Sequence, residues 1–121
     1  MTENANQKTY DLEDRSFEFA KQVRSFIRLL PKTLSNIEDA RQLVRSSGSV
    51  GSNYIEANDS LSKKDFIMRV KICRKEAKES RFWLKLLDTG NSSEAVAEQE
   101  ALIQEATELM NIFAAIVRKS E

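Results

Sequence analysis

Apolar residues recur at helical spacing in four stretches of this chain, and residues that interrupt helices separate the stretches. Because an α-helix advances about 100° per residue, the pattern predicts helices over about 12–30, 33–58, 62–87 and 93–118. Pro31 ends the first helix and Gly90 follows the third. Helices of similar length joined by short loops run antiparallel to their neighbours in sequence. The sequence therefore predicts an all-α fold, an antiparallel up-down-up-down four-helix bundle. We expect residues 1–121 to form a single domain with a flexible N-terminal tail over 1–10.

The third predicted helix has three distinct faces. Its core face carries Phe66, Val70, Cys73, Ala77, Leu84 and Leu87. A row of lysines lies nearly opposite, with Arg74 and Arg81 on its flank; its members are Lys64, Lys71, Lys75, Lys78 and Lys85. A second apolar stripe lies between these faces and consists of Met68, Ile72, Trp83 and Leu86. A helix of a monomeric bundle needs one apolar stripe, and a monomer rarely exposes a large apolar patch. The second stripe therefore predicts a homo-oligomer interface.

The middle of the second predicted helix is ambiguous. Residues 46–53, SSGSVGSN, have the composition of a loop, and each Gly in a helix costs about 1 kcal/mol relative to Ala. Gly48 and Gly51 nevertheless fall on the same side of a helix as Val44 and Ile55. Small residues on this side would let a neighbouring helix approach closely. We expect a continuous helix, with the loop as the alternative. One narrow side of this helix carries Ile37, Ala40, Val44, Gly48, Gly51 and Ile55.

The composition argues against most enzyme classes. The chain has no His, which removes Ser-His-Asp and Cys-His catalysis and His-ligated metals. It has no Gly-rich phosphate-binding motif, and its one cysteine, Cys73, lies on a predicted core face. We expect no enzymatic activity, no cofactor and no metal. The N-terminus is polar and no apolar run reaches ~18 residues, so we expect a cytoplasmic protein without a membrane segment.

Charge is balanced overall but unevenly distributed. The 19 basic residues equal the 19 acidic ones, yet residues 61–90 carry nine Lys or Arg against four Asp or Glu. Residues 91–121 carry two against six. The lysine row then has three interpretations: a solvated face, pairing with the acidic fourth helix inside an oligomer, or contact with nucleic-acid phosphates. Lys21, Arg24 and Arg28 form a similar row on the first predicted helix.

The most specific local motifs lie between residues 49 and 87. They are SVGSNYIEAN at 49–58, SKKDF at 62–66 and KEAKESRFWL at 75–84, with FAKQVR at 19–24 and Leu30-Pro31 upstream. On these residues the chain resembles the four-helix bundle proteins encoded by intervening sequences in bacterial 23S ribosomal RNA genes. It is also similar to their relatives, the accessory proteins of diversity-generating retroelements.

This resemblance implies a four-helix up-down bundle, ring-like homopentamers and no enzymatic activity. For the ribosomal-RNA branch it implies RNA binding. For the retroelement branch it implies nucleic-acid binding and contact with a reverse transcriptase.

Four polar residues match the resemblance by position. Asn53 and Glu56 match its N-x-x-E, and Glu76 and Glu79 match its K-E-A-x-E. The structural interpretation is that they bind Lys or Arg of adjacent helices and fix the helix register; the alternative is a direct role in binding. A di-metal site would need Glu-x-x-His motifs, which the chain lacks.

The sequence therefore predicts a non-enzymatic oligomer that binds the RNA or DNA backbone through basic helix faces, with low sequence specificity. The expected contacts are Lys64, Lys71, Arg74, Lys75, Lys78 and Lys85, with Lys21, Arg24 and Arg28. Phe82 and Trp83 can stack on bases, but Trp83 fits an oligomer or core contact better. The alternative function is a structural adaptor ring that binds a protein partner and no nucleic acid.

Overall fold

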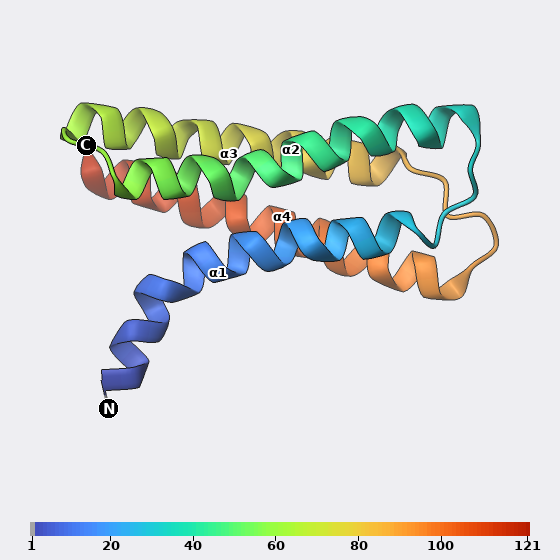
Figure 1. The fold of residues 1–121 in the computed structure, drawn as a ribbon, viewed down its shortest axis with the longest axis horizontal. Helices are drawn as coiled ribbons and strands as arrows, with labels where there is room; N and C mark the ends of the chain where they lie inside the picture. Colours follow the sequence, from blue (N-terminus) through green and yellow to red (C-terminus); the bar gives the residue numbers. More distant parts are fainter. Residues whose placement is uncertain (1) are drawn as a thin grey trace.

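Residues 2–121 form four antiparallel helices in the computed structural model, which describes the side chains of residues 12–121. The helices are α1 (Thr2–Ile27), α2 (Leu34–Asn58), α3 (Lys63–Leu86) and α4 (Ser93–Ser120). Each helix packs against the next in sequence, and α4 packs back against α1 (Figure 1). As a result α1 and α3 lie on one diagonal of the bundle, and α2 and α4 on the other. The predicted all-α up-down-up-down bundle is confirmed.

The helix boundaries follow local signals except in α1, where both ends differ from the prediction. We predicted that the first helix would reach Leu30, but α1 ends at Ile27 and two turn hydrogen bonds follow it, from Leu29 N to Phe26 O and from Leu30 N to Ile27 O. The residue before Pro31 avoids helical geometry, so the helix ends earlier. The backbone of α1 begins at Thr2, whereas we predicted Leu12. Met1 and the side chains of residues 1–11 lie outside the described part, so the flexible tail over 1–10 stays a prediction.

Hydroxyl caps start the other three helices. The side chains of Thr33, Ser62 and Ser92 accept hydrogen bonds from the third backbone N–H that follows each of them, at 3.1, 3.1 and 3.0 Å. Each cap satisfies one of the free N–H groups of a first helical turn, a contribution of about 1 kcal/mol. These caps explain why α2, α3 and α4 begin within a residue of their predicted starts.

The core contains the predicted face of α3. Val70, Cys73, Ala77 and Leu84 are fully buried. On α2 the buried apolar residues are Leu43, Val50, Tyr54 and Ala57, whereas Ile37 and Ile55 on the narrow side with the glycines are 45% and 52% exposed. The helix therefore carries two apolar rows, and the row with Ile37 and Ile55 lies beside α1, the close neighbour expected on that side.

Gly51 of α2 lies where the backbones of α1 and α2 approach each other. The helix is continuous through residues 46–53, which confirms the helical interpretation of SSGSVGSN. A Cβ atom placed on Gly51 would lie 3.3 Å from Ser16 Cβ, tighter than nine in ten contacts of this kind, whereas one on Gly48 would meet only the end of the Arg24 side chain at 3.8 Å. A side chain at position 51 would therefore make Ser16 shift by a few tenths of an ångström, whereas one at position 48 would not crowd α1.

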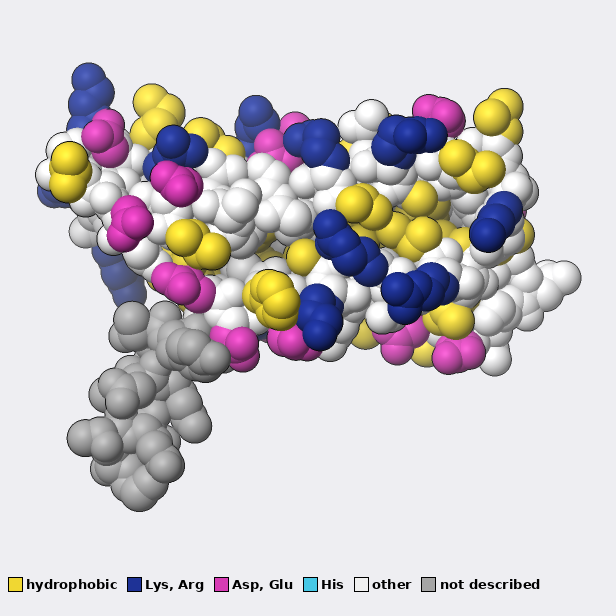
Figure 2. All heavy atoms as spheres, viewed as in Figure 1, with side chains coloured by type: hydrophobic (Ala, Val, Ile, Leu, Met, Phe, Trp, Pro, Cys, Tyr) yellow, Lys and Arg dark blue, Asp and Glu magenta, His cyan; other side chains and the backbone are white. Residues whose placement is uncertain are grey.

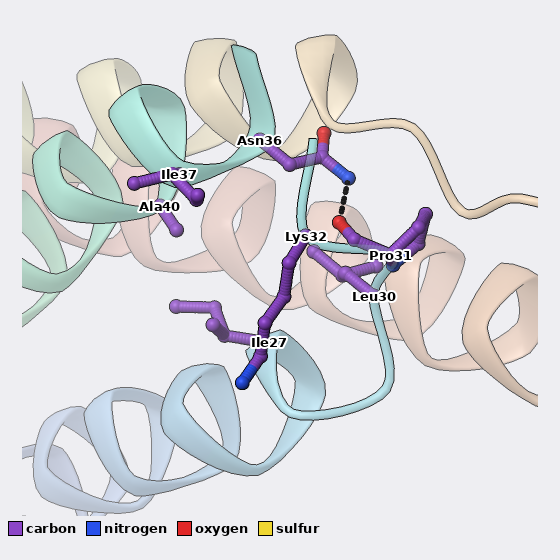
Figure 3. A pocket seen from close by; sticks show the side chains of 7 residues that line it. All are labelled: Ile27, Leu30, Pro31, Lys32, Asn36, Ile37 and Ala40. Atoms are coloured by element: carbon purple, nitrogen blue, oxygen red, sulfur yellow. Dashed lines mark hydrogen bonds between the residues drawn. The ribbon is translucent and has the colours of Figure 1, made fainter. Parts of the chain in front are cut away.

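Asn36 joins the two loops at one end of the bundle. Its Nδ2 donates to Pro31 O at 2.9 Å, in the loop between α1 and α2 (Figure 3). The same Nδ2 donates to Asp88 O at 2.8 Å, in the loop between α3 and α4. Asp88 N donates back to Asn36 Oδ1 at 3.0 Å. The residue is 3% exposed. Both loops therefore depend on one buried amide, which holds the ends of all four helices at this end in place.

The two glycines give a matched pair of stability predictions. We expect Gly48→Ala to stabilise the protein by about 0.5–1 kcal/mol, because it removes backbone freedom without a clash. We expect Gly51→Leu to destabilise it by about 1–3 kcal/mol, because the side chain must push α1 away. Urea unfolding followed by circular dichroism measures both changes. Wild-type stability in Gly51→Leu would contradict the close approach of α1 and α2.

Cys73 provides a test of burial and of pH dependence. Burial raises the pKa of its thiol from 9.0 to about 12. Because folding favours the neutral thiol, this contribution to stability is full below about pH 9 and is lost as the pH rises toward 12. We expect a disulfide reagent to leave Cys73 unmodified at neutral pH and to label it only after unfolding. Fast labelling of the folded protein would contradict the assigned orientation of α3.

Candidate nucleic-acid interface

The lysine row of α3 lies on the outer surface of the bundle. All five members, Lys64, Lys71, Lys75, Lys78 and Lys85, are exposed, and so is the flanking Arg74. The opposite face of the helix holds Val70, Cys73, Ala77 and Leu84 in the core. Because the direction of each side chain is set by its position around the helix axis, burial of the core face makes the lysine row point outward.

Most of this row has no acidic partner among the described residues. Lys71 Nζ lies 3.8 Å from Glu121 Oε2 at the end of α4, and within residues 12–121 no other lysine of the row is in an ion pair. The acidic face of α4 is instead used by α1. Arg15 contacts Glu105 at 2.7 Å and Glu108 at 2.6 Å. Pairing of the row with α4 inside one protomer is therefore limited to the Lys71 contact.

The Arg15 cluster is supported by its pKa directions. The hydrogen bond to Glu105 raises the pKa of Arg15. Hydrogen bonds from Gln104 and then from Arg15 lower the pKa of Glu108. Both changes favour the charged forms, so the cluster links α1 to α4 as an ion pair throughout the neutral pH range. These two carboxylates are thus engaged on the side of α4 that faces α1.

The second apolar stripe of α3 differs from its prediction. Met68 and Leu86 are 56% and 52% exposed, but Ile72 and Trp83 are half-buried, and Trp83 packs against the core. Met68 and Leu86 lie 18 residues apart, about 27 Å along the helix. We predicted one continuous stripe, but α2 covers its middle, where Arg45 contacts Glu76 and Glu79. Two exposed apolar ends remain.

The basic residues of α1 lie on a different side of the molecule from those of α3. Lys21, Arg24 and Arg28 are exposed, and α1 does not contact α3. Lys21 Nζ lies 5.8 Å from the centre of the Phe17 ring, and Arg24 donates to Ala20 O at 2.9 Å. The two basic rows therefore do not form one surface within a protomer.

A seam between α1 and α2 was not recognised in the sequence as a surface feature. It holds a hollow of about 410 Å³ beside Phe17, Gly51 and Ile55, and a second of about 220 Å³ beside Ile27, Pro31 and Ile37 (Figure 3). Figure 2 shows apolar side chains exposed between Lys and Arg side chains on this face. Phe17 is 59% exposed. The signal that would have located the seam is the narrow side of α2 with Ile37 and Ile55, where we expected a close neighbouring helix but no surface hollow.

Two aromatic residues, Tyr54 of α2 and Phe17 of α1, lie in different surroundings. Tyr54 is buried, and its ring centre lies 5.9 Å from that of Phe113. It is therefore part of the core. Phe17 projects over the seam between α1 and α2, away from α3.

The family-matched polar residues lie mainly between α2 and α3. Asn53 Oδ1 accepts a hydrogen bond from Arg69 at 3.0 Å, and Arg45 lies 3.5 Å from Glu76 and 3.2 Å from Glu79. These contacts are consistent with the structural interpretation. Glu56 is exposed and has no ion pair within residues 12–121. A direct binding role for any of the four stays a prediction.

Within the described residues no cluster of three or more potential metal-ligating side chains occurs. None of the helices in residues 2–121 has the length and apolar character needed to cross a bilayer.

The fold and this surface define a small antiparallel four-helix bundle with a lysine row on the outer side of one helix. The model of the family described as 23S rRNA-intervening sequence protein matches residues 8–115, and the chain belongs to this family. The assignment made from sequence motifs is confirmed, whereas the relation to retroelement accessory proteins stays a prediction.

A solved structure from Bacteroides thetaiotaomicron is similar to this chain. It is a protein with unknown function from the S23 ribosomal protein family, with 30% identity and a TM-score of 0.74. The match covers 88% of this chain and 97% of that chain. A search of curated proteins finds no match.

The contact of Arg45 with Glu76 gives a prediction about stability. The side chain of Glu76 is 8% exposed, and its Oε1 has no hydrogen-bond partner among the described residues. We expect Arg45→Met to destabilise the protein by about 1–3 kcal/mol, because it leaves a buried carboxylate without its cation. Thermal and urea unfolding measure the change.

The matched control is the same substitution in a Glu76→Gln background. With no buried charge to leave unpaired, Arg45→Met should then cost less than in the wild type. An equal cost in both backgrounds would show that the pair is energetically unimportant.

Proposed function

We propose that this protein is a non-enzymatic, self-associating bundle that binds the RNA or DNA backbone through the lysine row of α3. The observation that carries the proposal is the row itself, five exposed ammonium groups on one helix face with one ion pair among the described residues. The phosphate backbone of a nucleic acid is the polyanion that such a surface fits best, and each lysine binds a phosphate as a point charge. Because these contacts hold a backbone and reach no base edges, sequence specificity is low.

Self-association is supported by two different apolar areas on the surface. One contains Leu86 at the C-terminal end of the α3 stripe, and the other contains Phe17 and Ile55 beside the α1–α2 seam. A closed ring requires two unlike patches that contact each other in successive subunits. A ring, a homopentamer by the family resemblance, repeats the lysine row and multiplies weak contacts into higher avidity.

Salt dependence distinguishes backbone binding from other modes. Each phosphate neutralised on duplex DNA releases about 0.9 counterion, so several contacts in each subunit give a steep loss of affinity with salt. We expect reversal of Lys71, Lys75 and Lys78 to Glu to abolish binding to RNA and DNA at low salt. Fluorescence anisotropy measures the affinity, and light scattering measures the mass of the assembly against the 13.8 kDa protomer.

Two controls make this experiment decisive. Replacing the same three lysines by Arg keeps the charge and should keep the binding. Reversal of Lys21, Arg24 and Arg28 tests the other basic row on the opposite side of the bundle. Loss of binding in that variant alone would move the site to α1, and affinity independent of salt would remove the phosphate-binding proposal.

The second candidate function is a ring-shaped adaptor for a protein partner. In this alternative the α1–α2 seam binds the partner and not a neighbouring subunit, since the seam combines apolar hollows with exposed cations. A reverse transcriptase is the partner implied by the resemblance to retroelement accessory proteins. In this case the charge reversals on α3 leave partner binding intact, and the seam variant Ile55→Glu removes it.

A further inference from the structure

The outer row of α3 is a mixed row and not a row of lysines alone. In alternating steps of four and three residues it runs Lys64, Met68, Lys71, Lys75, Lys78, Phe82 and Lys85. A repeat of this kind drifts by only about 20° per seven residues on a straight helix, so all seven positions stay on the outer side. Met68 and Phe82 thus occupy two positions of a line that is otherwise cationic.

Phe82 is the aromatic residue of this row, and its side chain is largely exposed. It is 56% exposed and lies between Lys78 and Lys85 on the helix surface, one turn from each. Its ring contacts Trp83 at a centroid distance of 5.0 Å with an interplanar angle of 78°. Edge-on contact with a half-buried Trp83 holds the Phe82 ring from one side without covering its outer part.

The other apolar position of the row lies beside a hollow. Met68 and Ile67 line a space of about 440 Å³ together with Lys63, Lys64 and Lys71. Met68 and Phe82 are 14 residues apart, about 21 Å along the helix. Any polyanion laid along the row therefore meets cations in the middle and an apolar surface near each end.

We infer that the row recognises single-stranded nucleic acid in preference to duplex, with Phe82 stacking on an unpaired base while the flanking lysines contact phosphates. The inference rests on the proposed function and names the class of nucleic acid. Cations combined with accessible aromatic rings are the combination that fits a single strand, because every unpaired base offers an apolar face. In a duplex those faces are stacked inside, and Phe82 would meet only phosphate and sugar.

The experiment compares an unstructured oligouridylate with a hairpin duplex of equal phosphate number, using the full chain in its native assembly. We expect tighter binding of the single strand by the wild type. Phe82→Ala should weaken single-strand binding by roughly tenfold and leave duplex binding unchanged. Phe82→Trp should retain the wild-type preference, whereas Phe82→Leu, which keeps apolar surface but no aromatic face, should behave as Phe82→Ala.

Trp83 provides a second measurement that does not depend on affinity. It is the one tryptophan of the chain and touches Phe82, so a base stacked on Phe82 should quench its fluorescence. The duplex should cause a smaller change at saturation. Circular dichroism and light scattering confirm that each variant keeps its fold and its assembly.

The outcomes separate this inference from the proposed function. Equal affinity for the single strand and the duplex, or no loss in Phe82→Ala, overturns the single-strand inference and leaves backbone binding standing. Absence of binding to either nucleic acid at low salt overturns both.

Discussion

The burial of one face of α3 is the constraint on which the surface of this protein depends. Val70, Cys73, Ala77 and Leu84 are fully buried, and they fix the rotation of the helix about its axis. Apolar burial contributes about 25 cal/mol per Å², whereas exposed ion pairs contribute at most about 1 kcal/mol. The core therefore decides the direction of the lysines. Their positions follow from packing, and their own interactions contribute little to the fold.

The positions of the acidic residues are also set by helix packing, and as a result charge is unevenly distributed over the surface. Arg15 of α1 engages Glu105 and Glu108 on α4, and Arg45 of α2 engages Glu76 and Glu79 on α3. Each of these arginines joins two neighbouring helices across a seam. Apart from the contact between Lys71 and Glu121, no carboxylate of the described residues reaches the lysine row. A chain of zero formal charge thus folds into a bundle whose α3 carries an almost unpaired row of lysines among the described residues.

Much of the fold could be predicted because most of the helices carry one dominant pattern. The α3 core face stood out since lysines occupy the opposite side, and the helical interpretation of residues 46–53 followed from the glycines sharing a side. The core face of α2 could not be identified from the sequence. This helix has two apolar rows of similar composition, one with Leu43 and Val50 and one with Ile37 and Ile55, and only the positions of the neighbouring helices show which row is buried. The role of Asn36 was also hidden, since both loop carbonyls that it binds lie outside its own helix.

The exposed apolar residues of this protein therefore have two different origins. At the α1–α2 seam, Gly51 and Ser16 lie where the two backbones approach each other, and Phe17 and Ile55 lie exposed on the rim of the hollow beside them. Their positions follow from the packing of α1 on α2. Phe82 lies opposite the core, where no neighbouring helix covers it. Its edge contact with Trp83 accounts for one side of the ring, and aromatic pairs of this geometry are favourable. The remaining 56% of the residue is exposed beside the lysines, and this exposed part is what the proposed base contact uses.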